Sequence, residues 1–340
     1  MTGKRVVVTG ASGLLGRAVV KRFEAKGDKA EHTVIRLAFS RANEGYTKLD
    51  LMDEGAVEAF FSENKVDAVI HCAAERRPDV AEADPEKAAR INAAVPAHLA
   101  KLSQQHGFLL IYISTDYVFN GRSPPYEVDD KPDPLQMYGR QKLAGEQEVL
   151  KAREAGANVA VLRVPILYGQ VTYNAESAVN ILQDVMSSSQ LPVYGSAEDK
   201  LTCLVVEDQS GKEYKMDAYQ VRFPTNVSDV GRVLVHLTHL DKALPPILHY
   251  ASPAPSLTKY DMTTIIASAL SLPIKHVIPD RNKPESKPGQ TERPENTQLS
   301  TKALQDLGVD VSEEQEFEEW WKANAELHLE WRSDALERLN

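Results

Sequence analysis

A short segment near the amino terminus constrains the fold of this chain more than any other. Residues Val6 to Gly16 read VVVTGASGLLG, an apolar β-branched run typical of a buried strand, followed by a glycine-rich turn and the start of a helix. We expect the strand to end at Thr9. Gly10 and Gly13 allow unusual backbone conformations and the close approach of a pyrophosphate, while Gly16 allows the helix to pack against the strand. The free N–H groups of that helix would then face phosphates, so the segment predicts a dinucleotide site rather than a bare structural turn.

Charge and cysteine content narrow the class of protein. The 340 residues carry a formal net charge of −10 without a basic stripe, whereas nucleic-acid binding requires clustered Lys and Arg. Cys72 and Cys203 lie far apart in apolar segments, which indicates reduced thiols rather than a disulfide framework. The first strand begins at Arg5 and no apolar run is long enough to cross a bilayer. We therefore expect a cytoplasmic protein, with the nucleus allowed, that binds neither membrane nor nucleic acid and holds no metal.

The residues after the second predicted strand bear on the choice of cofactor. A helix is expected from Leu14 to Lys26, and the strand from Thr33 to Phe39. NAD sites usually place an acidic residue after this strand, whereas an arginine suits the additional phosphate of NADP. Phe39 is followed by Ser40 and Arg41, with no carboxylate before Glu44. The pattern favours NADP, although an arginine at a strand end can also be merely solvated.

Strands and helices continue to alternate along the chain, which is typical of an α/β fold with a doubly wound parallel sheet of the Rossmann type. The predicted strands are Lys48–Leu51, Val66–Ala74, Phe108–Ser114, Asn158–Val164, Arg222–Val227 (returning to the sheet) and Ile247–Tyr250, and the predicted helices are Asp53–Asn64, Asp84–His106, Ser228–Leu240 and Thr258–Leu270. Residues 1–170, with 222–252 returning to them, are expected to form the NADP-binding domain. Residues 171–221 and 253–310 are expected to form a smaller substrate-type lobe, followed by an acidic, Trp-rich tail at 311–340.

Two arginines follow the strand that ends at Ala74. Arg76 and Arg77 lie at the carboxyl end of a parallel strand, where open α/β sheets bind ligands. One interpretation places Arg76 near the cofactor and Arg77 near an anionic ligand or partner, and the other makes both of them surface charges paired with neighbours. Asn92, inside the following helix, can hydrogen-bond backbone near the site or be an ordinary helix asparagine.

Tyr138 and Lys142 are the candidate catalytic pair in this sequence. They are four residues apart on a predicted helix, so both side chains lie on one face. A phenol titrates near about 10, and an adjacent ammonium together with an oxidised nicotinamide would lower that pKa. Tyr138 could then exchange a proton with a carbonyl or alcohol oxygen. Thr115 would hydrogen-bond the same oxygen and Lys142 would hold the cofactor ribose.

These motifs carry a family resemblance that spans most of the chain. The segments Thr9–Gly16, Ser114–Phe119 and Tyr138–Lys142 resemble those of extended short-chain dehydrogenases/reductases of the dTDP-4-dehydrorhamnose reductase (RmlD-like) type. A narrower resemblance, to the family of regulatory β subunits of methionine adenosyltransferase, is carried by His71–Val80, Pro165–Gly169, Glu176–Val179 and Arg222–Thr225.

The resemblance has implications for both site and function. Cofactor contacts are implied for the glycine-rich turn and for positions along the cleft, namely Gly10, Ser12, Gly13, Leu14, Leu15, Gly16, Phe39, Ser40, Arg41, Asp50, Leu51, Cys72, Arg76, Tyr138, Lys142 and Leu167. The β subunits keep the reductase fold and its NADP site, but their role is to bind the catalytic subunit and tune S-adenosylmethionine synthesis in one-carbon metabolism.

Three hypotheses for the function follow. The first is an NADP-binding regulatory subunit of methionine adenosyltransferase. The second is an active NADPH-dependent reductase of a 4-keto sugar nucleotide, for which Thr115, Tyr138 and Lys142 would be catalytic. The third, dinucleotide-dependent redox sensing, requires only that the two NADP forms change the affinity for a partner.

The predicted smaller lobe contains a helix, a hairpin within an insertion, and a mobile loop. Ser177–Met186 is expected to be a helix, and Leu201–Val206 with Glu213–Met216 a hairpin inside a stretch, 187–219, that the β subunits lack. The insertion could cover a substrate, extend an interface or be a tolerated surface loop. Arg281–Arg293 is predicted to be a mobile loop, and Arg293 resembles a phosphate-binding arginine of sugar-nucleotide reductases, with an exposed structural arginine as the alternative.

The tail combines acidic charge with an aromatic face. All three tryptophans lie beyond residue 310, and residues 311–340 contain nine acidic and three basic side chains. Trp320, Trp321 and Trp331 fall on one helical stripe with Phe317, Leu327 and Leu339. The stripe can dock on its own domain or on another protein, and docking on its own domain is favoured.

Overall fold

A parallel sheet forms the centre of the molecule. A computed structural model describes residues 3–25, 32–186, 213–285 and 291–325, and across this part of the chain a seven-stranded sheet has the order β11-β6-β5-β4-β1-β2-β3. Every neighbouring pair is parallel. The strands are β1 (Arg5–Thr9), β2 (Thr33–Ala38), β3 (Thr47–Lys48), β4 (Ala68–His71), β5 (Leu109–Thr115), β6 (Val159–Val164) and β11 (Ile247–His249). The predicted doubly wound α/β fold is confirmed, with β3 and β4 shorter than predicted.

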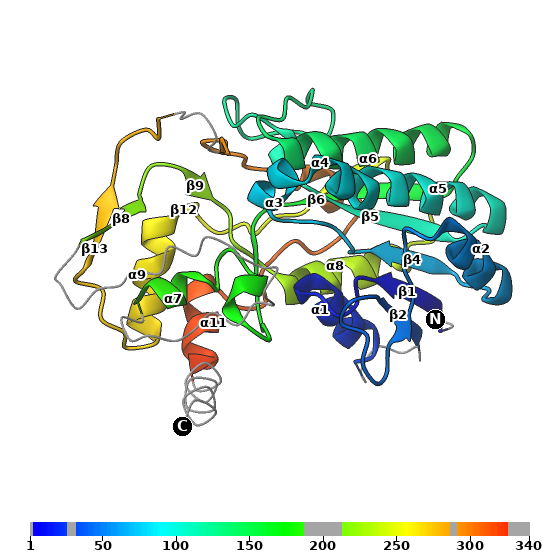
Figure 1. The fold of residues 1–340 in the computed structure, drawn as a ribbon, viewed down its shortest axis with the longest axis horizontal. Coiled ribbons are helices and arrows are strands. Elements are labelled where there is room, and N and C mark those ends of the chain that lie inside the picture. Colours follow the sequence, from blue (N-terminus) through cyan, green and yellow to red (C-terminus); the bar gives the residue numbers. More distant parts are fainter. Residues whose placement is uncertain (1–2, 26–31, 187–212, 286–290, 326–340) are drawn as a thin grey trace.

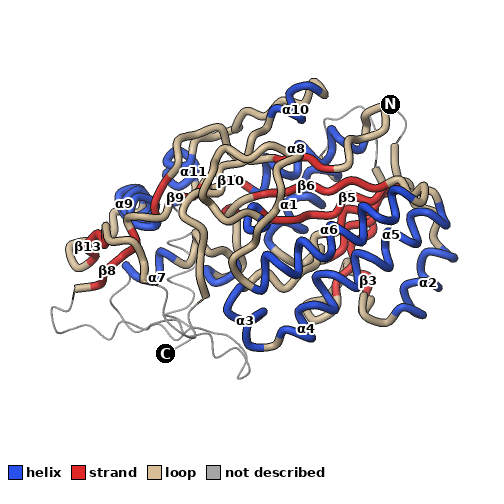
Figure 2. Tube along the Cα trace, turned by 90° about the horizontal axis from the view of Figure 1, so that it is seen from above, coloured by secondary structure: helices blue, strands red, loops and turns tan. Residues whose placement is uncertain are grey.

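Helices cover both faces of this sheet, and the alternation of side chains in β1 explains why. Val6 and Val8 are buried against α1 (Leu14–Phe23) and α8 (Val227–Thr238), whereas Val7 points to the opposite face. That face is covered by α2 (Glu54–Glu63), α5 (Val95–His106) and α6 (Met137–Glu154), as Figures 1 and 2 show. A strand buried on both faces needs a continuous apolar run, which is what the sequence contains.

The glycine-rich turn connects β1 to α1 largely as predicted. Gly10 has a φ of 61°, and a Cβ at that position would lie 2.8 Å from the backbone of Ala73. At Gly16 a Cβ would lie 2.2 Å from the carbonyl oxygen of Gly10, so helix and strand pack too closely for any other residue. Gly13 differs from the prediction. Its φ of −83° and ψ of 170° are open to all residues, and a Cβ there would lie 3.2 Å from the carbonyl oxygen of Gly10.

The long helix predicted between Asp84 and His106 is present but interrupted. The Asp84 side chain caps α4 (Pro85–Ala89), a π-helical segment occupies Arg90–Ala94, and α5 ends where Gly107 adopts a φ of 79°. A short helix that was not predicted from the sequence, α3 (Pro78–Ala83), precedes it. The extra residue in the π-helical turn changes the direction in which its side chains point.

A smaller lobe stands beside the sheet and is built from short paired strands. β7 (Leu167–Tyr168) pairs with β10 (Thr225–Asn226), β9 (Val221–Arg222) with β12 (Leu257–Thr258), and β8 (Tyr214–Asp217) with β13 (Val277–Asp280). The prediction that Arg222–Val227 returns to the main sheet was therefore wrong, although β11 does join it. Figure 1 shows this lobe to the left of the sheet.

Several predictions for this lobe were only partly correct. Ser177–Met186 contains a helix only at its end, α7 (Leu182–Met186), preceded by a single 3-10 turn at Asn174–Glu176. β8 pairs with β13, while the predicted hairpin arm at Leu201–Val206 lies outside the described residues. The predicted mobility of Arg281–Arg293 stays a prediction because 286–290 are not described. Thr258 caps α9 (Lys259–Ala269) with a capping box, as expected.

The described part of the tail docks on its own lobe. After α10 (Lys302–Asp306), α11 (Phe317–Ala323) buries Phe317, Trp320 and Trp321 against Tyr168 and α9. Docking on its own domain is confirmed for these residues, while Leu327, Trp331 and Leu339 lie outside the described part.

Cys72 is a free thiol, and Cys203 is not described. Within the described ranges no helix combines the length and apolarity needed to cross a bilayer.

Candidate functional site

A cleft of about 510 Å³ opens at the carboxyl ends of the strands and is lined by residues of both the sheet and the smaller lobe. The strand order reverses beside β1, which is where doubly wound sheets bind ligands. All of the predicted cofactor and catalytic positions line it: Gly10, Ser12, Gly13, Leu14, Leu15, Gly16, Phe39, Ser40, Arg41, Asp50, Leu51, Cys72, Arg76, Thr115, Tyr138, Lys142 and Leu167. The structure thus brings together residues that span most of the predicted larger domain. Their individual roles stay predictions.

The turn after β1 forms the floor of the cleft. Leu14 and Leu15 begin α1, and no side chain of the described part caps the first turn of this helix. Its leading N–H groups are therefore open to an anionic group. Gly13 leaves the approach to them clear, so the residues present fit a dinucleotide pyrophosphate.

The end of β2 forms the rim of the cleft. Phe39 is 50% exposed, and the ammonium of Lys48 lies 5.9 Å from the centre of its ring. Arg41 lies two residues beyond, with a half-exposed side chain, and it donates hydrogen bonds to Glu176 and to the Tyr173 hydroxyl. Arg41 is therefore held by protein partners rather than merely solvated.

The two arginines after β4 have separate environments. Arg76 lines the cleft and its Nη2 donates to the carbonyl oxygen of Ala175 at 2.8 Å. Arg77 forms an ion pair with Glu75, with 3.1 Å between Nε and Oε1. Arg76 thus fits the interpretation of a residue beside the cofactor, and Arg77 fits that of a charge paired with its neighbour.

Asn92 positions the segment that carries Arg76. It is fully buried in the π-helical segment, where its Oδ1 accepts from the N–H of Glu75 at 3.0 Å and its Nδ2 donates to the carbonyl of Glu75 at 3.0 Å. These two hydrogen bonds satisfy both the N–H and the C=O of Glu75. Of the two interpretations of Asn92, hydrogen bonding to backbone at the site is confirmed.

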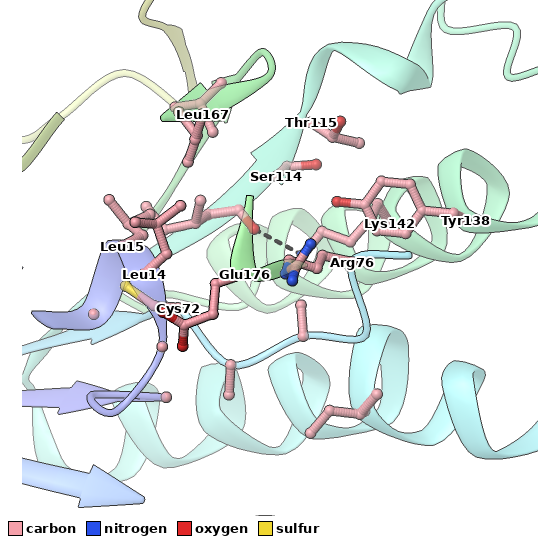
Figure 3. A pocket seen from close by; sticks show the side chains of 18 of the residues that line it. Leu14, Leu15, Cys72, Arg76, Ser114, Thr115, Tyr138, Lys142, Leu167 and Glu176 are labelled. Carbon is pink, nitrogen blue, oxygen red and sulfur yellow. Dashed lines mark hydrogen bonds between the residues drawn. The ribbon is translucent and has the colours of Figure 1, made fainter. Parts of the chain in front are cut away.

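Tyr138 and Lys142 lie on one face of α6, opposite Leu14 and Leu15, as Figure 3 shows. Lys142 is 2% exposed. Its Nζ donates to the carbonyl of Ile113 at 2.7 Å and lies 4.1 Å from the centre of the Tyr112 ring. Desolvation by burial lowers the pKa of Lys142 to about 7, with Glu146 and Cys72 opposing the shift.

The pKa of Tyr138 is raised by the fold rather than lowered, while the lowering expected from an oxidised nicotinamide stays a prediction. Burial raises the pKa of Tyr138, and Asp116 and Tyr117 raise it further, against opposing effects of a hydrogen bond with Thr115 and of the charge of Arg76. The desolvation that acts on the phenol also acts on Lys142, so the lysine does not supply the fixed positive charge that the argument from sequence assumed. Tyr138 is therefore protonated at neutral pH and able to donate rather than accept a proton.

Ser114, directly before Thr115, is a cleft residue to which no role was assigned from the sequence. The hydroxyl of Ser114 is buried at the carboxyl end of β5 and has no partner among the described residues. It lines the cleft and lies next to Thr115 in Figure 3. A buried hydroxyl without a partner fits a site that receives a polar ligand. Its position at a strand end was the signal that could have identified it.

Asp116 and three cations form the inner part of the cleft toward the smaller lobe. Burial raises the pKa of Asp116 to about 6, although Thr297, Arg222 and Thr115 oppose the shift. Arg222, Lys259 and Arg293 line the same part of the cleft. Desolvation, together with Arg293 and Arg222, lowers the pKa of Lys259 to about 8. Nη2 of Arg293 lies 3.4 Å from Oδ2 of Asp79, so the Arg293 side chain is neither isolated nor fully exposed. This half of the cleft is suited to an anionic ligand.

Glu176 was also missed as a site residue, because it comes from the smaller lobe. It reaches the cleft 135 residues after Arg41, with which it forms an ion pair. No local pattern could have linked the two positions. Within the described ranges no cluster of three or more His, Cys, Asp or Glu side chains is arranged to hold a metal ion.

Comparisons with known proteins agree on one family. The sequence profile of the RmlD substrate binding domain matches residues 4–194 and 192–322. The methionine adenosyltransferase 2 subunit beta of Xenopus tropicalis is 41% identical over 310 residues, which are 90% of this chain and 83% of that protein.

Solved structures are similar over nearly the whole chain. A dTDP-4-dehydrorhamnose reductase from Clostridium acetobutylicum has a TM-score of 0.73 and 26% identity, covering 96% of this chain and 99% of its own. One from Bacillus anthracis, solved in complex with NADP, has a TM-score of 0.72 and 24% identity, covering 94% and 97%. The second similarity supports the fold, and in that protein the fold binds NADP.

Proposed function

Because this chain belongs to the dTDP-4-dehydrorhamnose reductase-like family and, within it, is similar over most of its length to β subunits of methionine adenosyltransferase, we propose that it is an NADP-binding regulatory subunit of that enzyme. It would associate with the catalytic subunit and modulate S-adenosylmethionine synthesis. The observation that carries the proposal is the 41% identity, which extends over both the sheet and the smaller lobe.

The cleft supports NADP as the bound nucleotide. The uncapped start of α1 would hold the pyrophosphate, Arg41 would face the additional phosphate, and Lys142 would hold the ribose of the nicotinamide half. Bound NADPH supplies a hydride to a carbonyl in the reductases of this fold. For a regulatory subunit only its binding is required.

Association with the catalytic subunit is tested by copurification and kinetics. Tagged full-length protein, incubated with methionine adenosyltransferase at micromolar concentrations, is expected to elute with it and to change its KM or kcat. Repeating the measurement with NADP+ and with NADPH tests redox sensing, which predicts different affinities for the two forms. Absence of a complex and of any kinetic change would reject the regulatory function.

The alternative function is reduction of a 4-keto sugar nucleotide by NADPH. It is favoured by the cationic inner half of the cleft, with Arg222, Lys259 and Arg293, and by a protonated Tyr138 beside Thr115. Tyr138 would donate its proton to the carbonyl oxygen, and Thr115 would orient that oxygen.

Substrate-dependent oxidation of NADPH separates the two functions. The reductase hypothesis predicts turnover that is lost in Tyr138→Phe while NADPH binding is retained. If no keto sugar nucleotide oxidises NADPH, the reductase hypothesis is rejected and the regulatory proposal stands.

The cytoplasm, with the nucleus allowed, remains the proposed location.

A further inference from the structure

One turn of the smaller lobe connects three separate parts of the nucleotide cleft. The 3-10 turn Asn174–Glu176 is held by three arginines from different elements of the larger domain. Arg17 of α1 pairs with Glu176, with 2.6 Å between Nη2 and Oε2, and Arg41 after β2 pairs with the other carboxylate oxygen, Oε1. Arg76 after β4 donates to the carbonyl of Ala175 at 2.8 Å. The turn is therefore joined to all three elements by arginine side chains, and Figure 3 shows Glu176 and Arg76 side by side.

Glu176 is a buried carboxylate that stays charged. It is 3% exposed, and its Oε2 also accepts from the backbone N–H of Thr172 at 2.8 Å. Burial raises the pKa of Glu176, but the hydrogen bonds from Arg17, Thr172 and Arg41 outweigh that effect and hold the pKa below its usual value.

The two arginines on Glu176 differ in accessibility. The side chain of Arg41 is 45% exposed, whereas that of Arg17 is 27% exposed and also donates to the carbonyl of Ser12 at 2.7 Å. Arg17 is thus tied to the glycine-rich turn, and Arg41 is the cation that a ligand at the rim can reach. If Arg41 turned toward a ligand, Arg17 and Thr172 would still hold Glu176.

These contacts change the argument about cofactor choice. The absence of a carboxylate between Phe39 and Glu44 favoured NADP, because NAD sites place an acid there. The fold supplies an acid at that place from a distant position, since Glu176 reaches Arg41. A phosphate carrying nearly two negative charges and a carboxylate compete for the same guanidinium and repel each other.

We propose that Glu176 is an internal counter-ion that the 2′-phosphate of NADP(H) displaces from Arg41, so that Glu176 weakens the preference of this cleft for the phosphorylated dinucleotide over NAD(H). The inference rests on the proposed nucleotide site and adds a residue that determines its specificity. NAD(H) has no 2′-phosphate to bind Arg41, so it leaves the Arg41–Glu176 ion pair intact.

Calorimetric titration of the full-length protein with NADPH and NADH tests this inference. Glu176→Gln keeps the shape of the side chain and removes its charge, and it is expected to strengthen NADPH binding by about fivefold while changing NADH binding by less than about twofold. In an Arg41→Met background the same substitution is expected to strengthen NADPH binding by less than in the wild type, because the contested cation is absent and only the direct repulsion between carboxylate and phosphate is relieved.

Two further variants control for general effects. Glu24→Gln removes the partner of Arg36 from an exposed ion pair, 2.7 Å long, and is expected to change neither affinity. If Glu176→Gln does not fold, Glu176→Asp retains a charge for Arg17 but reaches less far toward Arg41, and it is expected to shift the NADPH affinity in the same direction.

The possible results separate this inference from the proposal on which it rests. If the wild-type protein binds neither dinucleotide, the NADP site is rejected and the inference with it. If the wild-type protein binds NADPH but Glu176→Gln weakens that binding, leaves it unchanged or strengthens NADH binding equally, the nucleotide site stands and the role of Glu176 is rejected.

Discussion

At the scale of single residues, burial dominates the chemistry of the candidate site. Tyr138 and Lys142 are spaced as a pair in which the cation would lower the pKa of the phenol. In the folded chain both groups lose solvation, which raises the pKa of Tyr138 and lowers that of Lys142 to about 7. Because desolvation always disfavours the charged form, it acts in opposite directions on an acid and a base.

The low pKa of Lys142 makes stability depend on pH. The pKa of an unfolded lysine is near 10.5, so between pH 7 and 9 the unfolded chain holds a proton that the folded protein releases. The free energy of unfolding should therefore rise with pH, by up to about 1.4 kcal/mol per pH unit from this group. In Lys142→Met that contribution should be absent. Urea unfolding at pH 7, 8 and 9 measures the difference.

Two lysines serve as references for this measurement. Lys259, with a pKa near 8, contributes in the same direction but is present in both proteins, so its effect cancels in the comparison. Lys302 is exposed beside Asp306, and Lys302→Met should retain the wild-type pH dependence. Equal slopes for the wild type and Lys142→Met would contradict the argument.

At the scale of secondary-structure elements, the π-helical segment Arg90–Ala94 positions one wall of the cleft. Its Asn92 holds the backbone of Glu75, directly before Arg76, and the carbonyl of Asn92 accepts from the Tyr112 hydroxyl at 2.9 Å. A Cβ at Gly145 of α6 would lie 2.4 Å from that carbonyl, so helix packing and the shape of the segment depend on each other. π-helical turns are frequent at functional sites.

Removal of the Asn92 amide tests this role. Asn92→Ala leaves the N–H and C=O of Glu75 without their side-chain partner and should lower the free energy of unfolding by about 2 kcal/mol. Backbone hydrogen exchange should accelerate at residues 74–77, and NADPH should bind less tightly because Arg76 loses its support. Asn64→Ala is the control, since Asn64 lies at the end of α2 away from residues 74–77, where it donates to the carbonyl of Phe60 and accepts from Arg5. Unchanged exchange at 74–77 would argue against the positioning role.

At the scale of the whole molecule, the smaller lobe and the start of the tail form one core. α11 inserts Trp320 and Trp321 beside Tyr168, and the same cluster includes Val179 and Met262. These aromatic side chains face inward, so Phe317, Trp320 and Trp321 are not available as anchors for another protein.

The contribution of this packing can be measured directly. Trp321 is fully buried, and Trp321→Ala should lower the free energy of unfolding by about 3 to 5 kcal/mol because it leaves a large cavity. Lys322→Ala removes an exposed side chain paired with Glu318 and should cost less than about 1 kcal/mol. Chemical denaturation of both variants gives the comparison. A similar loss in the two would mean that α11 stabilises the lobe little.

The amino-acid sequence by itself determined the parallel sheet and the glycine-rich turn, and its family resemblance implied many of the residues that line the cleft. The sheet and the turn depend on local periodicity and on the rule that parallel strands present their carboxyl ends at one edge, so they can be derived without long-range information. Only the tertiary structure decided that Glu176 meets Arg41, that Asn92 holds Glu75 and that burial raises the pKa of Tyr138. These depend on which distant segments pack together and on how much water that packing excludes, neither of which a local pattern contains.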